Sequence, residues 1–136
     1  MTQAPAPDGP RPVPLLDRVE ERVLGSLLEK AATTPEYYPM SLNALTNACN
    51  QKSNRLPVVE LDEKSVARAL ESLREKGLVR VVSGADQRVP KYRQVFAEAF
   101  GFTPPQVALL CELMIRGPQT PGELRGRASR MHPFDE

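Results

Sequence analysis

The sequence is poor in the residues from which metal and redox sites are built. It has no tryptophan, three tyrosines and four phenylalanines among 136 residues, so the hydrophobic core must be mainly aliphatic. His132 is the single histidine, and the two cysteines, Cys49 and Cys111, lie far apart in the chain. We therefore expect no metal site, and we expect both cysteines to be reduced core residues.

An excess of charge of one sign and long apolar runs are also missing. Eighteen basic and seventeen acidic residues leave a net charge of +1, so the net charge indicates no general attraction to polyanions. The longest nearly apolar run, 107–115, is interrupted by Glu112 and is too short to cross a bilayer. The first residues lack the features of a secretory signal, so we expect a cytoplasmic protein with no membrane association.

Catalytic motifs are absent as well. The sequence contains no glycine-rich phosphate loop, no nucleophile elbow, no HExxH motif and no paired carboxylates framed by apolar residues. These absences predict that the protein is not an enzyme and uses no cofactor. No motif in the sequence indicates a small-molecule ligand either.

Proline is abundant and unevenly placed. Five of the fourteen prolines lie within the first fourteen residues, a segment without hydrophobic periodicity. This composition predicts a disordered or extended tail over 1–14. Most other prolines fall where helices should begin or end, whereas Pro90 lies inside a predicted strand.

Two helices are predicted after this tail. Asp17 and Glu20 form a capping box at the start of an apolar pattern with helical spacing, which predicts a helix over 17–32. Ser41 is placed to cap a second, shorter helix that ends near Asn50.

A third helix and a hairpin follow a linking stretch at 51–60. Asp62 can cap the helix, and Gly77 supplies its end. Two β-rich runs, 78–82 and 88–94, flank a polar turn and predict a hairpin whose last strand is an edge. Three short helices followed by a hairpin indicate a winged helix-turn-helix domain, a mainly α fold of the α+β class.

The rest of the chain partly repeats this order. Thr103 and Gln106 make another capping box for a helix that ends at Gly117, and Thr120 opens a further helix through about Ser129.

The predicted organisation is therefore a tail at 1–14, a winged helix at 15–98 and the first two helices of a second winged helix at 99–136. Because no third helix or wing follows, we expect the apolar stripe of 107–114 to be partly exposed.

The exposed face of the third helix places cations before anions. Lys64 and Arg68 precede Glu71 and Glu75, although cations are unfavourable near a helix N-terminus. This order predicts that the first half of the helix faces DNA phosphates or a guanine edge, with Ser65 beside it. A solvated face, with Arg68 pairing to Glu71, is the alternative.

The predicted hairpin is strongly basic. It carries Arg80, Arg88, Lys91 and Arg93, with Tyr92 among them. A basic wing is suited to backbone or minor-groove contact. However, edge strands also carry arginine and lysine simply to prevent sheet-to-sheet pairing.

A polar segment before the third helix is the last candidate. Lys52, Ser53, Asn54 and Arg55 can donate to phosphates or base edges, while local bonding within the loop is the alternative. The linking stretch is also longer than the usual turn of a DNA reader. The complete set of predicted DNA-binding residues is Lys52, Ser53, Asn54, Arg55, Lys64, Ser65, Arg68, Arg80, Arg88, Lys91, Tyr92 and Arg93.

Several runs resemble the YceH family. They lie at 27–30, 34–36, 38–55 and 120–125, and the long run from Ser41-Leu-Asn-Ala-Leu45 to Asn54-Arg55 is the most specific. The resemblance implies a bacterial cytoplasmic protein with two tandem winged-helix domains and an uncharacterised role. Members of that family continue through a complete second winged helix, so this chain resembles a fragment or a natural truncation.

Two functions remain open. The first is a DNA-binding module, of the kind found in transcriptional regulators, with double-stranded DNA as partner. The second is a scaffold for a protein partner or a homodimer without DNA binding, because the winged-helix fold serves both purposes.

Overall fold

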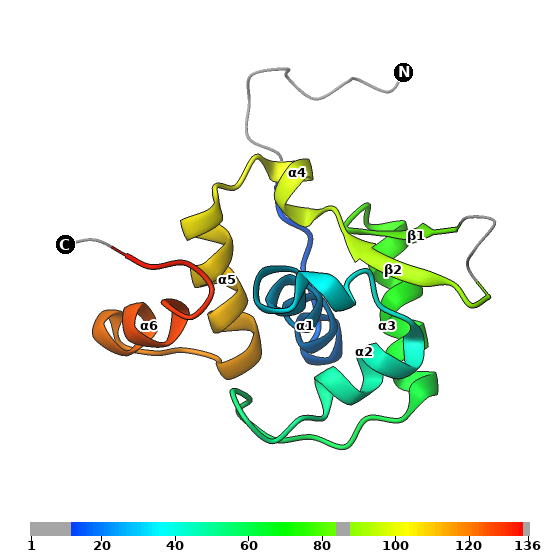
Figure 1. Ribbon diagram of the computed structural model, residues 1–136, viewed down its shortest axis with the longest axis horizontal. Helices are drawn as coiled ribbons and strands as arrows, with labels where there is room; N and C mark the ends of the chain where they lie inside the picture. The colour runs from blue at the N-terminus through cyan, green and yellow to red at the C-terminus, as the bar shows by residue number, and fades with distance from the viewer. Residues whose placement is uncertain (1–11, 84–87, 135–136) are drawn as a thin grey trace.

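Figure 1 shows the computed structural model, which describes residues 12–83 and 88–134. The predicted tail at 1–14 and the predicted turn of the hairpin lie almost wholly outside the described residues. The short stretch from 12 to 17 has no regular secondary structure.

The first three helices begin at the predicted caps. Helix α1 spans Arg18–Thr33, α2 spans Leu42–Cys49 and α3 spans Glu63–Glu75. At α1 the backbone N–H of Glu20 donates to the Asp17 carboxylate (2.8 Å), and the N–H of Asp17 donates to the Glu20 carboxylate (2.9 Å). Each bond satisfies an N–H that the helix itself leaves unpaired.

The hairpin is shorter than predicted. Strand β1, Val79–Val82, pairs antiparallel with β2, Lys91–Gln94. Pro90 lies just before β2 rather than inside it, because proline has no N–H for the ladder. The expectation that β2 is an edge was also wrong, since Tyr92 and Met40 exchange backbone hydrogen bonds of 2.7 and 3.0 Å on its other side.

The second half of the chain contains two predicted helices and one that was missed. Helix α5 spans Pro104–Arg116 and begins at the predicted capping box. Helix α6 spans Pro121–Ala128 and begins at Thr120 as predicted, where Thr120 and Glu123 form a capping box that was not predicted. The missed helix is α4, Phe96–Phe100. In the first half of the chain, the 3-10 turn η1, Pro35–Tyr37, was not predicted either. The described chain is mainly helical with a two-stranded hairpin, which confirms the α+β class. No helix in its described part has the length and hydrophobicity needed to traverse a bilayer.

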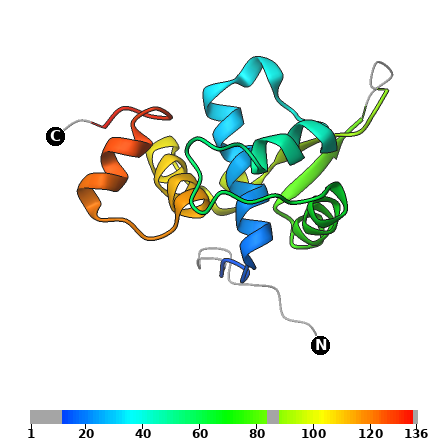
Figure 2. The same ribbon diagram turned by 90° about the horizontal axis from the view of Figure 1, so that it is seen from below.

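Helix α1 lies at the centre of the molecule. Figures 1 and 2 show α2, α3 and the hairpin on one side of it and α5 and α6 on the other. One hydrophobic cluster joins the two sides, since α1 residues such as Leu24 pack with Leu70 of α3 and with Cys111 and Ile115 of α5. The core is therefore continuous across the predicted boundary at 98, and the division into domains stays a prediction.

Two expectations about side chains can be compared with this core. Cys49 and Cys111 are buried and free, as predicted. The stripe of 107–114 is not generally open, because Val107, Leu110 and Met114 pack against the cluster and only part of it, at Leu113, is exposed. The stripe is therefore partly exposed, as expected.

Gly25 allows α1 and α5 to approach closely. A Cβ atom at this position would lie 2.7 Å from Cγ2 of Ile115 and 3.0 Å from Cβ of Met114. The Cys111 thiol also lies 3.2 Å from the Gly25 carbonyl oxygen, to which it donates. A side chain here must push the two helices apart or displace Ile115.

Substitution Gly25→Ala is therefore expected to lower the free energy of unfolding by about 1–3 kcal/mol, as overpacked cores do. Urea denaturation measures this change. Gly126→Ala is the matched control, since Gly126 is also helical but has no atom within 4 Å of a built Cβ. The control should be neutral or slightly stabilising, and equal effects of the two substitutions would contradict the close contact.

Candidate nucleic-acid interface

The first half of α3 exposes cations without ion pairs. Lys64 and Arg68 are exposed, and neither forms an ion pair with another described residue. The alternative pairing of Arg68 with Glu71 is not formed, because Glu71 binds Arg74 at 2.8 Å instead. Ser65 is half-buried beside them, and its N–H donates to the Asp62 carboxylate (2.8 Å) as part of the helix cap.

The same cap shows the electrostatic effect of these cations. The hydrogen bonds from Ser65 hold the pKa of Asp62 below its usual 3.8, and the charges of Arg68 and Lys64 lower it further. The second half of α3 is different, since Glu71 and Glu75 are exposed. An anion would therefore meet favourable charge only over the first half of the helix.

Three cations share one face of the hairpin. Arg80 lies directly opposite Arg93, and Val82 lies opposite Lys91. Because cross-strand partners point to the same face, the side chains of Arg80, Lys91 and Arg93 lie together on it. Of these three cations, only Arg93 forms an ion pair with a described residue, Glu98 at 3.0 Å. Like charges placed opposite each other are unfavourable unless an anion joins them.

The remaining two hairpin residues, Arg88 and Tyr92, differ in their exposure to solvent. Arg88 is exposed just before β2 and adds to the basic character of the wing. Tyr92 lies on the opposite face and packs against the hydrophobic cluster. Its ring is partly buried there, and contact of Tyr92 with DNA stays a prediction.

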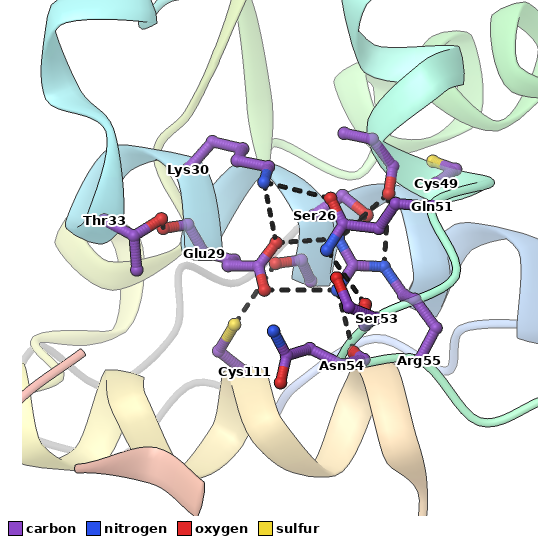
Figure 3. A network of polar contacts seen from close by, with 12 residues as sticks. Ser26, Glu29, Lys30, Thr33, Cys49, Gln51, Ser53, Asn54, Arg55 and Cys111 are labelled. Carbon is purple, nitrogen blue, oxygen red and sulfur yellow. Dashed lines mark hydrogen bonds and ion pairs between the residues drawn. The ribbon is translucent and has the colours of Figure 1, made fainter. Parts of the chain in front are cut away.

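Arg55 requires a correction, because its guanidinium lies inside the protein (Figure 3). Only 4% of the residue is exposed. Its Nη1 and Nη2 atoms donate to the two carboxylate oxygens of Glu29 at 3.1 and 2.7 Å, and its Nε donates to the Ala48 carbonyl at 3.1 Å. A side chain with these bonds is not available to a phosphate, so Arg55 is not part of the DNA-binding set.

The neighbours of Arg55 divide between interior and surface. Asn54 has a left-handed backbone (φ 57°), and its side-chain oxygen accepts from Nη2 of Arg116 at 2.8 Å. Lys52 and Ser53 remain exposed, although the Ser53 carbonyl accepts from the Gln51 amide. Local bonding, the alternative for this loop, accounts for the contact between Gln51 and Ser53, whereas the side chains of Asn54 and Arg55 bind residues far away in the chain.

The sequence analysis did not predict the buried polar network to which Arg55 belongs. Glu29, 1% exposed, also binds Nη1 of Arg130 at 2.7 Å. Nη2 of Arg130 lies 3.4 Å from Glu112, which is fully buried. Arg116 lies 2.7 Å from the same Glu112 carboxylate, but the two closest atoms are not aligned for a hydrogen bond. This network joins α1, the loop at 51–55, α5 and the segment after α6.

A signal for this network was present in α1. Arg22, Ser26 and Glu29 recur at helical spacing within a helix whose other residues are largely apolar, and all three are buried. A polar stripe on a central helix indicates internal partners rather than solvent. In the described ranges no three histidine, cysteine or acidic side chains gather as metal ligands.

The electrostatics of Glu29 follow from burial and from its partners. Burial raises the pKa of its carboxyl, but the hydrogen bonds and charge of Arg55, with smaller contributions from Arg130 and Lys30, outweigh burial and bring the pKa below the usual 4.5. The carboxylate is therefore ionised at neutral pH. Its contribution to stability is complete above about pH 4.5 and is lost as the pH falls through the lowered folded-state pKa.

Substitution Glu29→Gln should lower the free energy of unfolding at pH 7 by about 3 kcal/mol, because it leaves buried arginines without their counter-charge. The loss of stability below pH 4.5 should also become shallower than in the unchanged protein. Urea denaturation between pH 3 and pH 7 measures both effects. The exposed Glu71→Gln should change stability by less than about 1 kcal/mol, and a comparable loss in both variants would contradict the assigned role of Glu29.

The comparisons with known proteins give a family without an assigned role. The model of a family described as a protein of unknown function, DUF480, matches residues 16–136. A UPF0502 protein of Citrifermentans bemidjiense is 64% identical over 121 residues, covering 89% of this chain and 56% of that protein. A UPF0502 protein of Opitutus terrae is 57% identical over 129 residues, covering 95% and 56%. The chain thus spans little more than half the length of these relatives.

Proposed function

The chain belongs to the DUF480 family of proteins of unknown function, and we propose that it is a DNA-binding winged-helix protein of a regulatory kind. The observation that supports this most is the cationic face of the hairpin, where Arg80 and Arg93 lie directly opposite each other with Lys91 beside them. A phosphate backbone is a natural counter-ion for such a face.

The first half of α3 supplies the second part of the proposed surface. Lys64 and Arg68 are exposed and have no counter-ion among the described residues. Recognition helices commonly use their N-terminal residues for bases and phosphates. The acidic second half, with Glu71 and Glu75, restricts the contact to this end and opposes a deeper insertion of the helix.

The remaining parts of the proposal follow from the order of elements. Helices α1 to α3 and the hairpin form the winged helix, and α5 with α6 correspond to the first two helices of a second one. Without the buried Arg55, the cations proposed to contact double-stranded DNA are Lys52, Lys64, Arg68, Arg80, Arg88, Lys91 and Arg93. The proposal includes a cytoplasmic location and no catalytic activity.

The proposal predicts salt-sensitive binding to a mixed-sequence duplex. The double variant Arg68→Gln with Arg80→Gln should bind about tenfold more weakly, and the slope of log K against log salt should become shallower by about 2, since each lost phosphate contact removes about 0.9. Fluorescence anisotropy of a labelled duplex across a salt series measures both quantities.

A matched control separates this surface from charge in general. Arg125→Gln with Arg127→Gln also removes two cations, but from α6, which lies at the other end of the molecule from the hairpin (Figure 1). Binding by this control should be nearly unchanged. Equal losses in the two double variants, or no salt-sensitive binding by the unchanged protein, would reject the proposed interface.

A protein-interaction scaffold is the second candidate. The mixed charge of α3, with Glu71 and Glu75 exposed beyond Lys64 and Arg68, suits a protein surface better than a phosphate backbone. Analytical ultracentrifugation with and without duplex distinguishes the two functions. Self-association that duplex does not change would favour the scaffold, whereas a complex with duplex would favour DNA binding.

A further inference from the structure

A pocket of about 360 Å³ lies away from the proposed DNA-binding surface. The first half of α1, the loop around Leu56 and the last turn of α5 form its walls. Its volume is within the range of sites for small molecules. The pocket combines charged side chains on α1 with apolar side chains on the loop and on α5.

Arg22 is the unusual residue of this pocket. It is only 6% exposed, and its guanidinium donates to the carbonyl oxygens of Cys49 (3.0 Å) and Pro57. Its Nε is buried and has no hydrogen-bond partner. Arg55 is comparably buried but binds Glu29, whereas Arg22 has no ion pair with any described residue.

No carboxylate among the described residues forms an ion pair with Arg22. Burial lowers the pKa of its guanidinium, and the positive charge of Arg55 lowers it further. A buried cation without a counter-ion is costly. The energetics of this site therefore favour the arrival of an anion.

The other charged residues of the pocket leave this imbalance in place. Arg18 is exposed at the pocket and has no ion pair among the described residues. Arg116 is already neutralised by Glu112 at 2.7 Å. Glu21 is the one acidic residue of the lining. The lining therefore contains two arginines without an ion pair among the described residues, Arg18 and Arg22, and one carboxylate.

The opposite wall is apolar and open to water. Leu56 is 64% exposed and Leu113 is 37% exposed, and Met114 lies beside them in the lining. Exposed leucines next to an unpaired arginine suit a ligand that is charged at one end and apolar at the other. Covering these side chains would add to the affinity of such a ligand.

We propose that this pocket binds a small carboxylate that carries an apolar group. The carboxylate lies next to Arg22 and Arg18, and the apolar group covers Leu56 and Leu113. This site does not depend on the proposed DNA binding, because it uses none of the same residues.

Titration of the full chain with hexanoate, followed by amide chemical shifts in ¹H–¹⁵N spectra, tests the proposal. Saturable shifts are expected around residues 18–22, 56–57 and 113–117. Hexanol removes the charge and acetate removes the apolar group, so each should bind at least about tenfold more weakly than hexanoate. Equal binding of hexanoate and hexanol, no saturation, or shifts spread over the whole surface would overturn the proposal.

Surface variants keep the test independent of folding. Arg18→Gln and Leu113→Asn change exposed residues of the pocket and should each weaken hexanoate binding by about threefold or more. Arg74→Gln and Leu15→Asn make the same changes at exposed positions outside it and should leave binding unchanged. Hexanoate affinity that is the same in all four variants would also overturn the assignment.

Discussion

The buried carboxylate of Glu29 is the interaction on which the arrangement of the chain depends. It lies on the central helix α1 and binds Arg55 from the loop before α3 and Arg130 from the segment after α6. Charges this deep are tolerated only with partners of good geometry, so the three segments must meet at one place. The hydrophobic cluster packs around the same helix, and Gly25 lets α5 approach it closely.

This interaction separates the arginines into two groups with different roles. Arg55, Arg116 and Arg130 neutralise buried carboxylates, whereas Arg68 and Arg80 are exposed without counter-ions among the described residues. A net charge of +1 conceals this separation, because it counts both groups alike. The external cations support the DNA-binding proposal, and Arg22, buried without a carboxylate, supports a separate ligand site.

The sequence predicted those features that depend on neighbouring residues. The caps at Asp17, Ser41 and Asp62 were predictable because each side chain accepts from an N–H only three residues away. The burial of Arg55 was not predictable in this way, since its partner Glu29 lies 26 residues earlier in the chain. The basic segment at 52–55 was therefore predicted to be more exposed than it is. The bridge between Met40 and Tyr92 was missed for the same reason, since the two residues are far apart in the chain.

A double-mutant cycle on Glu29 and Arg55 tests the central claim most directly. Glu29→Gln, Arg55→Met and the combined variant are compared with the unchanged protein by urea denaturation at pH 7. If the buried ion pair holds the loop to α1, the two single changes are strongly non-additive, with a coupling energy of at least about 2 kcal/mol. Additive effects, within about 0.5 kcal/mol, would show that the two residues act independently and would contradict the account.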